Sequence, residues 1–141
     1  MQPEKFLDVA RRLAKTGNPE DCRSAISRAY YAAFNVAQRM GFPKPSGNHH
    51  NTLQRRLLNS GDSEITRLGS ELADFCEQRN RADYQMDHKP SESQANADAA
   101  VLRAEEAIKA LNTCLIYSDR WKQIRASIAH VIVTGNDIIY L

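Results

Sequence analysis

The chain has 141 residues, of which 42% are hydrophobic and 26% are charged, as in folded globular domains. This composition excludes a disordered chain, a collagen-like repeat and a disulfide scaffold, and the length predicts one domain. The formal net charge of +2 is too small to indicate a nucleic-acid-binding protein from bulk electrostatics. Of the 19 basic residues 6 are lysine and 13 are arginine, whose planar guanidinium suits phosphate recognition.

Segments for export or membrane insertion are not visible in the sequence. The longest apolar runs fall far below the roughly 20 residues of a membrane span, and the first residues lack the apolar core of a signal peptide. We therefore expect a cytoplasmic protein that has no contact with a membrane. Cys22, Cys76 and Cys114 form no Cys-x-x-Cys pair, so we expect three reduced core cysteines.

Apolar side chains recur at steps of three and four along most of the chain, which predicts helices. Gly17 ends the first helix, and Asn18 followed by Pro19 begins the second. A proline- and glycine-rich loop follows Met40, and Pro90 sets a limit for the fourth helix. The expected helices cover residues 3–16, 19–40, 51–59, 62–89, 91–117 and 119–129.

The last residues have a different pattern. Two short runs of β-branched and aromatic residues, 131–133 and 138–140, flank a turn that contains Gly135 and Asn136. We therefore predict an all-α antiparallel helical bundle over residues 1–129. Residues 130–141 are predicted to be a C-terminal extension in the form of a short β-hairpin.

Polar residues on the second helix form the first candidate surface. Ser24, Ser27, Arg28 and Tyr31 follow steps of three and four, so they are expected to share one polar stripe opposite an alanine-rich face. The alanines would let another helix approach closely. The alternative is an ordinary amphipathic helix with a solvated arginine.

The second candidate surface lies just before Pro90. Arg81, Tyr84 and His88 stand at i, i+3 and i+7, and on a continuous helix they would line one face over about 10 Å. Arginine supplies a permanent charge for a phosphate, and histidine gains or loses a proton near neutral pH. The alternative is that Arg79 pairs with Asp83 while His88 lies at a frayed helix end.

Other familiar sites are absent from the sequence. It contains no glycine-rich phosphate loop, no Gly-x-Ser-x-Gly motif and no His-Glu-x-x-His motif. We accordingly expect neither a cofactor nor a metal ion.

The two candidate segments together resemble the HEPN superfamily of small helical proteins. The resemblance rests on Ser-Arg-Ala-Tyr-Tyr-Ala-Ala-Phe at 27–34 and Arg-Asn-Arg-Ala-Asp-Tyr at 79–84. These motifs are similar to those of a bacterial branch with Ser-Arg-x-Tyr-Tyr-Ala and Arg-x-x-Ala-Asp-Tyr segments. His50, ahead of a helix that ends in Asn-Ser-Gly, also fits that branch, and the similarity spans about residues 5–117.

The resemblance implies an antiparallel helical bundle that is often a homodimer. Many such proteins are metal-independent ribonucleases with an arginine, four to six residues and then a histidine. Six residues separate Arg81 from His88, whereas eight separate Arg79 from His88. The expected catalytic residues are Arg81, His88 and Tyr84. The expected substrate-binding residues are Arg79, Asn80, Asp83, Arg28, Tyr31 and His50.

Three functions are compatible with this sequence. The first is a ribonuclease that acts as a toxin or in antiphage defence, with a nucleotidyltransferase-like antitoxin as its partner. The second is a non-catalytic HEPN module that binds a nucleotide, RNA or a partner protein, and the Ala-Asp-Tyr run at 82–84 favours it. The third is a purely structural adaptor. The spacing of Arg81 and His88 favours the first.

Overall fold

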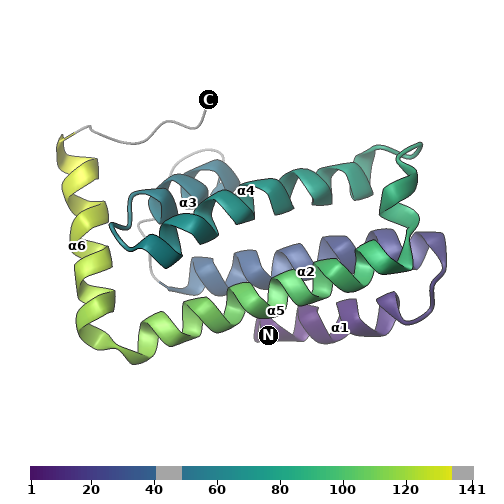
Figure 1. Cartoon of the computed structure of the whole chain (residues 1–141), viewed down its shortest axis with the longest axis horizontal. Helices are drawn as coiled ribbons and strands as arrows, with labels where there is room; N and C mark the ends of the chain where they lie inside the picture. The colour runs from purple at the N-terminus through teal and green to yellow at the C-terminus, as the bar shows by residue number, and fades with distance from the viewer. Residues whose placement is uncertain (41–48, 135–141) are drawn as a thin grey trace.

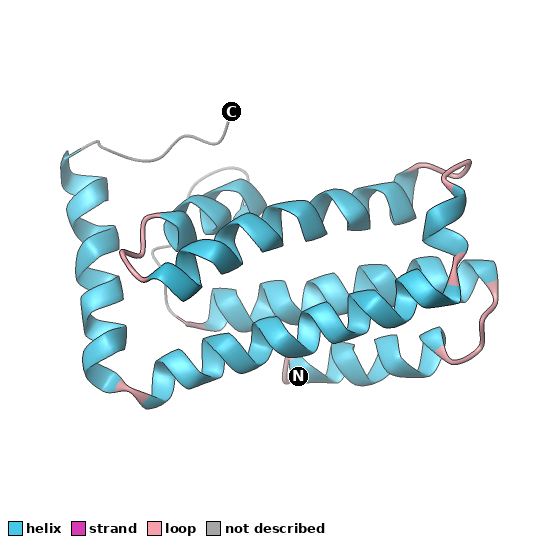
Figure 2. Cartoon of the chain, viewed as in Figure 1, coloured by secondary structure: helices cyan, strands magenta, loops and turns pink. Residues whose placement is uncertain are grey.

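The computed structural model of the chain describes residues 1–40 and 49–134. Within these ranges the chain is helical, with short connections and no strand (Figure 2). The elements are α1 (Glu4–Ala14), α2 (Pro19–Arg39), α3 (His49–Leu58), α4 (Ser63–Tyr84), the 3₁₀ helix η1 (Lys89–Glu92), α5 (Gln94–Ile116) and α6 (Ser118–Thr134).

Local sequence signals account for three of the helix boundaries. Gly17 follows α1 with a φ of 71°, a left-handed conformation that costs glycine little and stops the helix. Pro19 occupies the first turn of α2, where its missing N–H is not needed. Asp62 caps α4, because its carboxylate accepts a hydrogen bond from the backbone N–H of Ile65 at 3.1 Å.

Helices α1, α4 and α5 form a bundle around α2 (Figure 1). α2 packs against α1, α4 and α5, and α3 packs against α4. Consecutive helices α1 and α2, and again α4 and α5, run antiparallel, whereas α2 and α5 run in the same direction. α6 lies across the end of the bundle where α5 ends, opposite the connection between α4 and α5. The predicted helical bundle is therefore confirmed for the described residues.

The core lies between α2 and its neighbours. Ile26 and Tyr30 of α2, Phe75 of α4 and Leu111 of α5 are almost completely buried. The three cysteines are buried and free, as expected. Over residues 1–40 and 49–134 no helix combines the length and the apolarity that crossing a bilayer would need.

The predicted C-terminal hairpin is wrong where the structure describes it. Residues 131–134 belong to α6, which continues through the predicted boundary between residues 129 and 130. Ile124 and Ile128 of α6 are buried, and Ile132 continues the same step of four residues. Helical periodicity therefore outweighs the strand preference of three consecutive β-branched residues. The rest of the predicted hairpin, residues 135–141, lies outside the described residues.

Candidate functional site

The residues of the second motif, at 79–84 on α4, have different surroundings. Arg79 is buried, whereas Asn80 and Arg81 are exposed. Successive positions of an α-helix are rotated by about 100°, so residues two positions apart point in nearly opposite directions. Arg79 therefore faces the bundle interior, and Arg81 faces a surface pocket.

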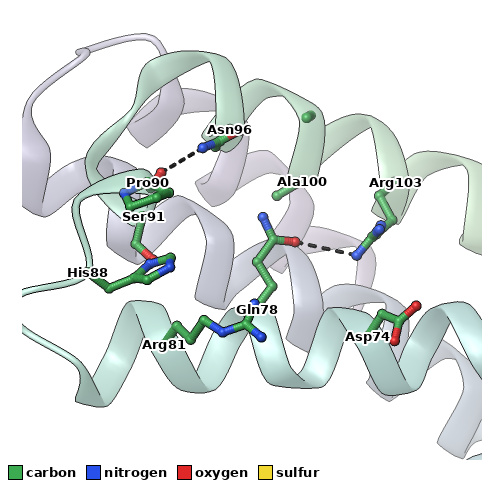
Figure 3. A pocket seen from close by; sticks show the side chains of 10 residues that line it. Asp74, Gln78, Arg81, His88, Pro90, Ser91, Asn96, Ala100 and Arg103 are labelled. Atoms are coloured by element: carbon green, nitrogen blue, oxygen red, sulfur yellow. Dashed lines mark hydrogen bonds between the residues drawn. The ribbon is translucent and has the colours of Figure 1, made fainter.

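The surface pocket is an open cavity of about 470 Å³ between α4, η1 and α5 (Figure 3). Arg81 and His88 both line it, so the structure brings these two predicted residues to one site. The full lining is Asp74, Gln78, Arg81, His88, Pro90, Ser91, Asn96, Ala99, Ala100 and Arg103.

His88 reaches this pocket from a turn, which corrects the expectation of a continuous helix. α4 ends at Tyr84, and Gln85 leaves the helical conformation with φ −103° and ψ 89°. The chain then turns back, and His88 lies directly before η1. Pro90 lies in the first turn of η1, where its missing N–H is not needed.

The imidazole of His88 is half-buried and held by one short contact. Its Nδ1 lies 2.7 Å from the hydroxyl oxygen of Ser91, a distance typical of a hydrogen bond. If Nδ1 donates to Ser91, then Nε2 is unprotonated and can accept a proton. If the hydroxyl donates instead, a neutral ring carries its proton on Nε2. Either way the contact orients the ring and leaves Nε2 for proton transfer.

Arg81 is held loosely, by one exposed ion pair. Its guanidinium lies 3.5 Å from the Glu77 carboxylate, one turn earlier on α4. The Arg81 side chain is 45% exposed and the Glu77 side chain is 69% exposed. Such solvent-exposed pairs contribute roughly 0–1 kcal/mol, so an anion can replace Glu77 at little cost.

Sequence reasoning missed the contribution of α5 to the pocket. Arg103 donates a hydrogen bond to the Gln78 side-chain oxygen at 3.4 Å, and its guanidinium lies 5.3 Å from the centre of the Phe75 ring. Asn96 bonds to the Pro90 carbonyl at 2.8 Å. The steps from Asn96 to Ala99 or Ala100 and then Arg103 were the available signal, because they place these residues on one helix face.

A second cluster of predicted residues lies inside the bundle, around Arg79. The Arg79 guanidinium carbon lies 5.2 Å from the ring centre of Tyr30 and 5.3 Å from that of Tyr31. An Asp83 oxygen lies 3.9 Å from the guanidinium and accepts a hydrogen bond from Ser27 at 3.1 Å. These contacts link α4 to α2, and we call them the Arg79 cluster.

His50 of α3 joins the Arg79 cluster from the other side. Its Nδ1 lies 2.6 Å from the Tyr30 hydroxyl, and its ring centre lies 4.4 Å from that of Phe34. Burial raises the pKa of the Tyr30 phenol well above its ordinary value, so the hydroxyl stays neutral. Tyr31, Arg79, Asp83 and His50 are therefore one assembly, separate from the lining of the surface pocket.

Three predicted residues belong to neither group. Arg28 is exposed, and its guanidinium lies 5.4 Å from the centre of the Phe6 ring of α1. Because Ser27 is buried against α4, the expected shared polar stripe on α2 is wrong. Asn80 is exposed, and Tyr84 is 74% exposed and outside the lining of the pocket.

Among the described residues, no group of three or more His, Cys, Asp or Glu side chains could hold a metal ion. The pocket lining offers arginines and side-chain amides instead, which are groups that bind anions. Comparison of the chain with protein-family models, with curated proteins and with solved structures found no match in any of the three.

Proposed function

We propose that the chain is a metal-independent ribonuclease whose active site is the pocket lined by Arg81 and His88. The observation that carries the proposal is the position of a loosely held arginine and an oriented histidine in one open pocket. The catalytic roles are His88 for proton transfer and Arg81 for the phosphate. Tyr84 lies outside the lining, and we assign it no role in the reaction.

The reaction needs no nucleophile from the protein, because RNA carries its own. The 2′-oxygen attacks the adjacent phosphorus, the new O2′–P bond forms and the P–O5′ bond breaks. A proton leaves the 2′-hydroxyl and a proton is delivered to the departing 5′-oxygen. The products are a 2′,3′-cyclic phosphate and a 5′-hydroxyl. His88 provides one of these proton transfers, a contribution typically of about 10²–10⁴-fold in rate.

The pocket also supplies charge for the phosphate. Negative charge grows on the non-bridging oxygens as the 2′-oxygen attacks, and cationic donors stabilise it. Arg81 and Arg103 approach from α4 and α5, against the single carboxylate of Asp74 in the lining. Arginine presents a planar pair of donors to phosphate oxygens, so both can bind in a bidentate manner.

The resemblance of the two motifs to the HEPN superfamily supports the same function. What it implies is a toxin of a toxin–antitoxin system or an antiphage defence protein. A homodimer, an RNA target and a nucleotidyltransferase-like antitoxin are its further implications, and they stay predictions.

The proposal is tested by RNA cleavage with purified protein and two variants, Arg81→Gln and His88→Ala. Each should lose about 10²-fold or more of the rate without a change in folding. Arg67→Gln is the matched control for Arg81, because Arg67 also lies exposed on α4 and pairs with a glutamate one turn away. His130→Ala, exposed on α6, controls for His88.

Cleavage by the parent protein should persist in EDTA, because no step uses a metal ion. Cleavage that stops in EDTA, or that both site variants retain at the parent rate, would contradict the proposal.

A second candidate is a non-catalytic module that binds a nucleotide or RNA. The observation that favours this module is the composition of the pocket lining. The lining includes Gln78, Asn96 and Arg103, whose side chains can bind a ligand without transferring a proton. Such a module would cleave no RNA and would keep its affinity for RNA in His88→Ala, while Arg81→Gln would weaken binding. Cleavage by the parent protein would exclude this alternative.

A further inference from the structure

Arg23 of α2 is a buried arginine that the sequence motifs do not include. Its relative exposure is 9%, although arginine is rarely buried without partners. It does not line the pocket, and its side chain extends from α2 to the end of α4. Its partners lie at the end of α4, in the turn that carries His88 and in η1.

The guanidinium of Arg23 donates hydrogen bonds to a set of backbone carbonyls. One terminal nitrogen lies 3.0 Å from the Ala82 oxygen and 2.9 Å from the Gln85 oxygen. The other lies 2.9 Å from the Met86 oxygen and 3.1 Å from the His88 oxygen. Ala82 belongs to the last turn of α4, where carbonyls lack intrahelical partners and carry partial negative charge, so a buried cation satisfies its carbonyl well.

Glu92 of η1 fixes the guanidinium from the far side of the turn. Its carboxylate oxygen lies 3.2 Å from Nε of Arg23 and 3.1 Å from a terminal nitrogen. The hydrogen bond from Arg23 lowers the pKa of Glu92 below its ordinary value. Arg23 therefore joins three elements, α2, the end of α4 and η1, around the loop from Gln85 to His88.

We propose that Arg23 is a positioning residue, which holds this turn so that the imidazole of His88 projects into the pocket. The role rests on the proposed ribonuclease function, because His88 is the group that Arg23 positions. Only arginine has five N–H donors in one plane, which lets a single side chain serve carbonyls of residues 82, 85, 86 and 88 together. The single ammonium group of a lysine could donate hydrogen bonds to only some of these carbonyls.

The activity test compares Arg23→Met and Arg23→Lys with the parent protein. Displacement of a catalytic group by about 1 Å can cost 10²-fold, so kcat of Arg23→Met should fall about 10- to 100-fold. KM should change by less than about twofold, because Arg81 and Arg103 still line the pocket. Arg23→Lys should recover part of kcat. Arg67→Met is the control for loss of an exposed arginine.

A second readout does not depend on activity. In the folded Arg23→Met protein, amide hydrogen exchange at residues 85–88 should accelerate and the NMR signals of the His88 ring should shift, whereas Arg67→Met leaves both unchanged. If Arg23→Met does not fold, the same two measurements are made on Glu92→Gln. We expect smaller changes in amide exchange and in the His88 signals, in the same direction.

Unchanged exchange and unchanged His88 signals in a folded variant would overturn the positioning role. If the parent cleaves no RNA, the ribonuclease proposal fails, and the exchange and NMR measurements still decide whether Arg23 holds the turn.

Discussion

Arg79 and Arg81 stand two positions apart on α4, yet the structure gives them different surroundings. Arg79 is 6% exposed and lies over two tyrosine rings, whereas the Arg81 side chain is 45% exposed beside the pocket. A buried cation needs its partners, so Arg79 contributes to stability. An exposed cation with one weak partner contributes little to stability and can bind a ligand.

This difference predicts opposite phenotypes for the same substitution. Arg79→Met should lower the free energy of unfolding by about 2 kcal/mol, because it removes desolvated contacts with Tyr30 and Tyr31. Arg81→Met should change it by less than about 0.5 kcal/mol and abolish RNA cleavage. Denaturant unfolding and a cleavage assay on both variants check the pair. Equal stability losses would contradict the assignment.

The sequence predicted a shared surface for Arg81 and His88, but not the way in which the two residues meet. Arg81 and His88 were expected on one face of a continuous helix, whereas they line the same pocket from either side of a turn. Sequence reasoning missed Arg23, which shares the α2 face of Ser27 and Tyr30, because an arginine in a helix is ordinarily solvated. Helical spacing places Arg23 on this face of α2, but only the tertiary contacts reveal its hydrogen-bond partners.

At the scale of elements, the start of α4 is fixed to α6 by one carboxylate. Asp62 caps α4 and also accepts hydrogen bonds from Arg120 at 2.6 Å and 2.8 Å. The hydrogen bonds from Arg120 are the main reason that the pKa of Asp62 lies below its ordinary value. Ser127 of α6 adds a hydrogen bond to the Asn59 carbonyl, at the end of α3, at 2.9 Å.

The Asp62–Arg120 pair predicts a pH-dependent loss of stability. Because the folded pKa of Asp62 is lower than the unfolded value of about 3.9, the pair stabilises the fold above that pH. The stabilisation is lost as the pH falls through the folded pKa. Asp62→Asn keeps a good cap but loses the charge, so it should cost about 1–2 kcal/mol at pH 7.

Unfolding of the parent and Asp62→Asn at pH 7 and at pH values below 4 checks this prediction. The difference between the two proteins should shrink as the pH falls. A difference that stays constant across this range would show that the charge of Asp62 contributes nothing.

The elements themselves were largely predictable, because their apolar stripes repeat with a helical period. The errors in the prediction concern the residues at which α4 and α6 end. At the end of α4, Arg23 donates hydrogen bonds to the carbonyls of Arg81 and Ala82, a long-range contact that the local sequence does not reveal. The end of α6 was placed too early because β-branched residues 131–133 were given more weight than the continuing step of four.

At the scale of the whole molecule, the two ends of the bundle differ in structure. α6 covers one end through Asp62 and Arg120. The other end carries the turn between α4 and η1 (Figure 1). There Arg23 of α2 bonds to the backbone of His88, and His88 lines the pocket together with Arg103 of α5. Binding and catalytic residues often lie on loops that a rigid scaffold positions, and the candidate active site follows that arrangement.

The most direct test of the central claim is to identify the product ends formed from RNA and from a DNA strand of the same sequence. If the 2′-hydroxyl is the nucleophile, RNA yields fragments that end in a 2′,3′-cyclic phosphate, each with a 5′-hydroxyl partner, and the DNA strand is not cut. Cleavage of both strands, or RNA fragments with a 3′-hydroxyl and a 5′-phosphate, would contradict the mechanism assigned to Arg81 and His88.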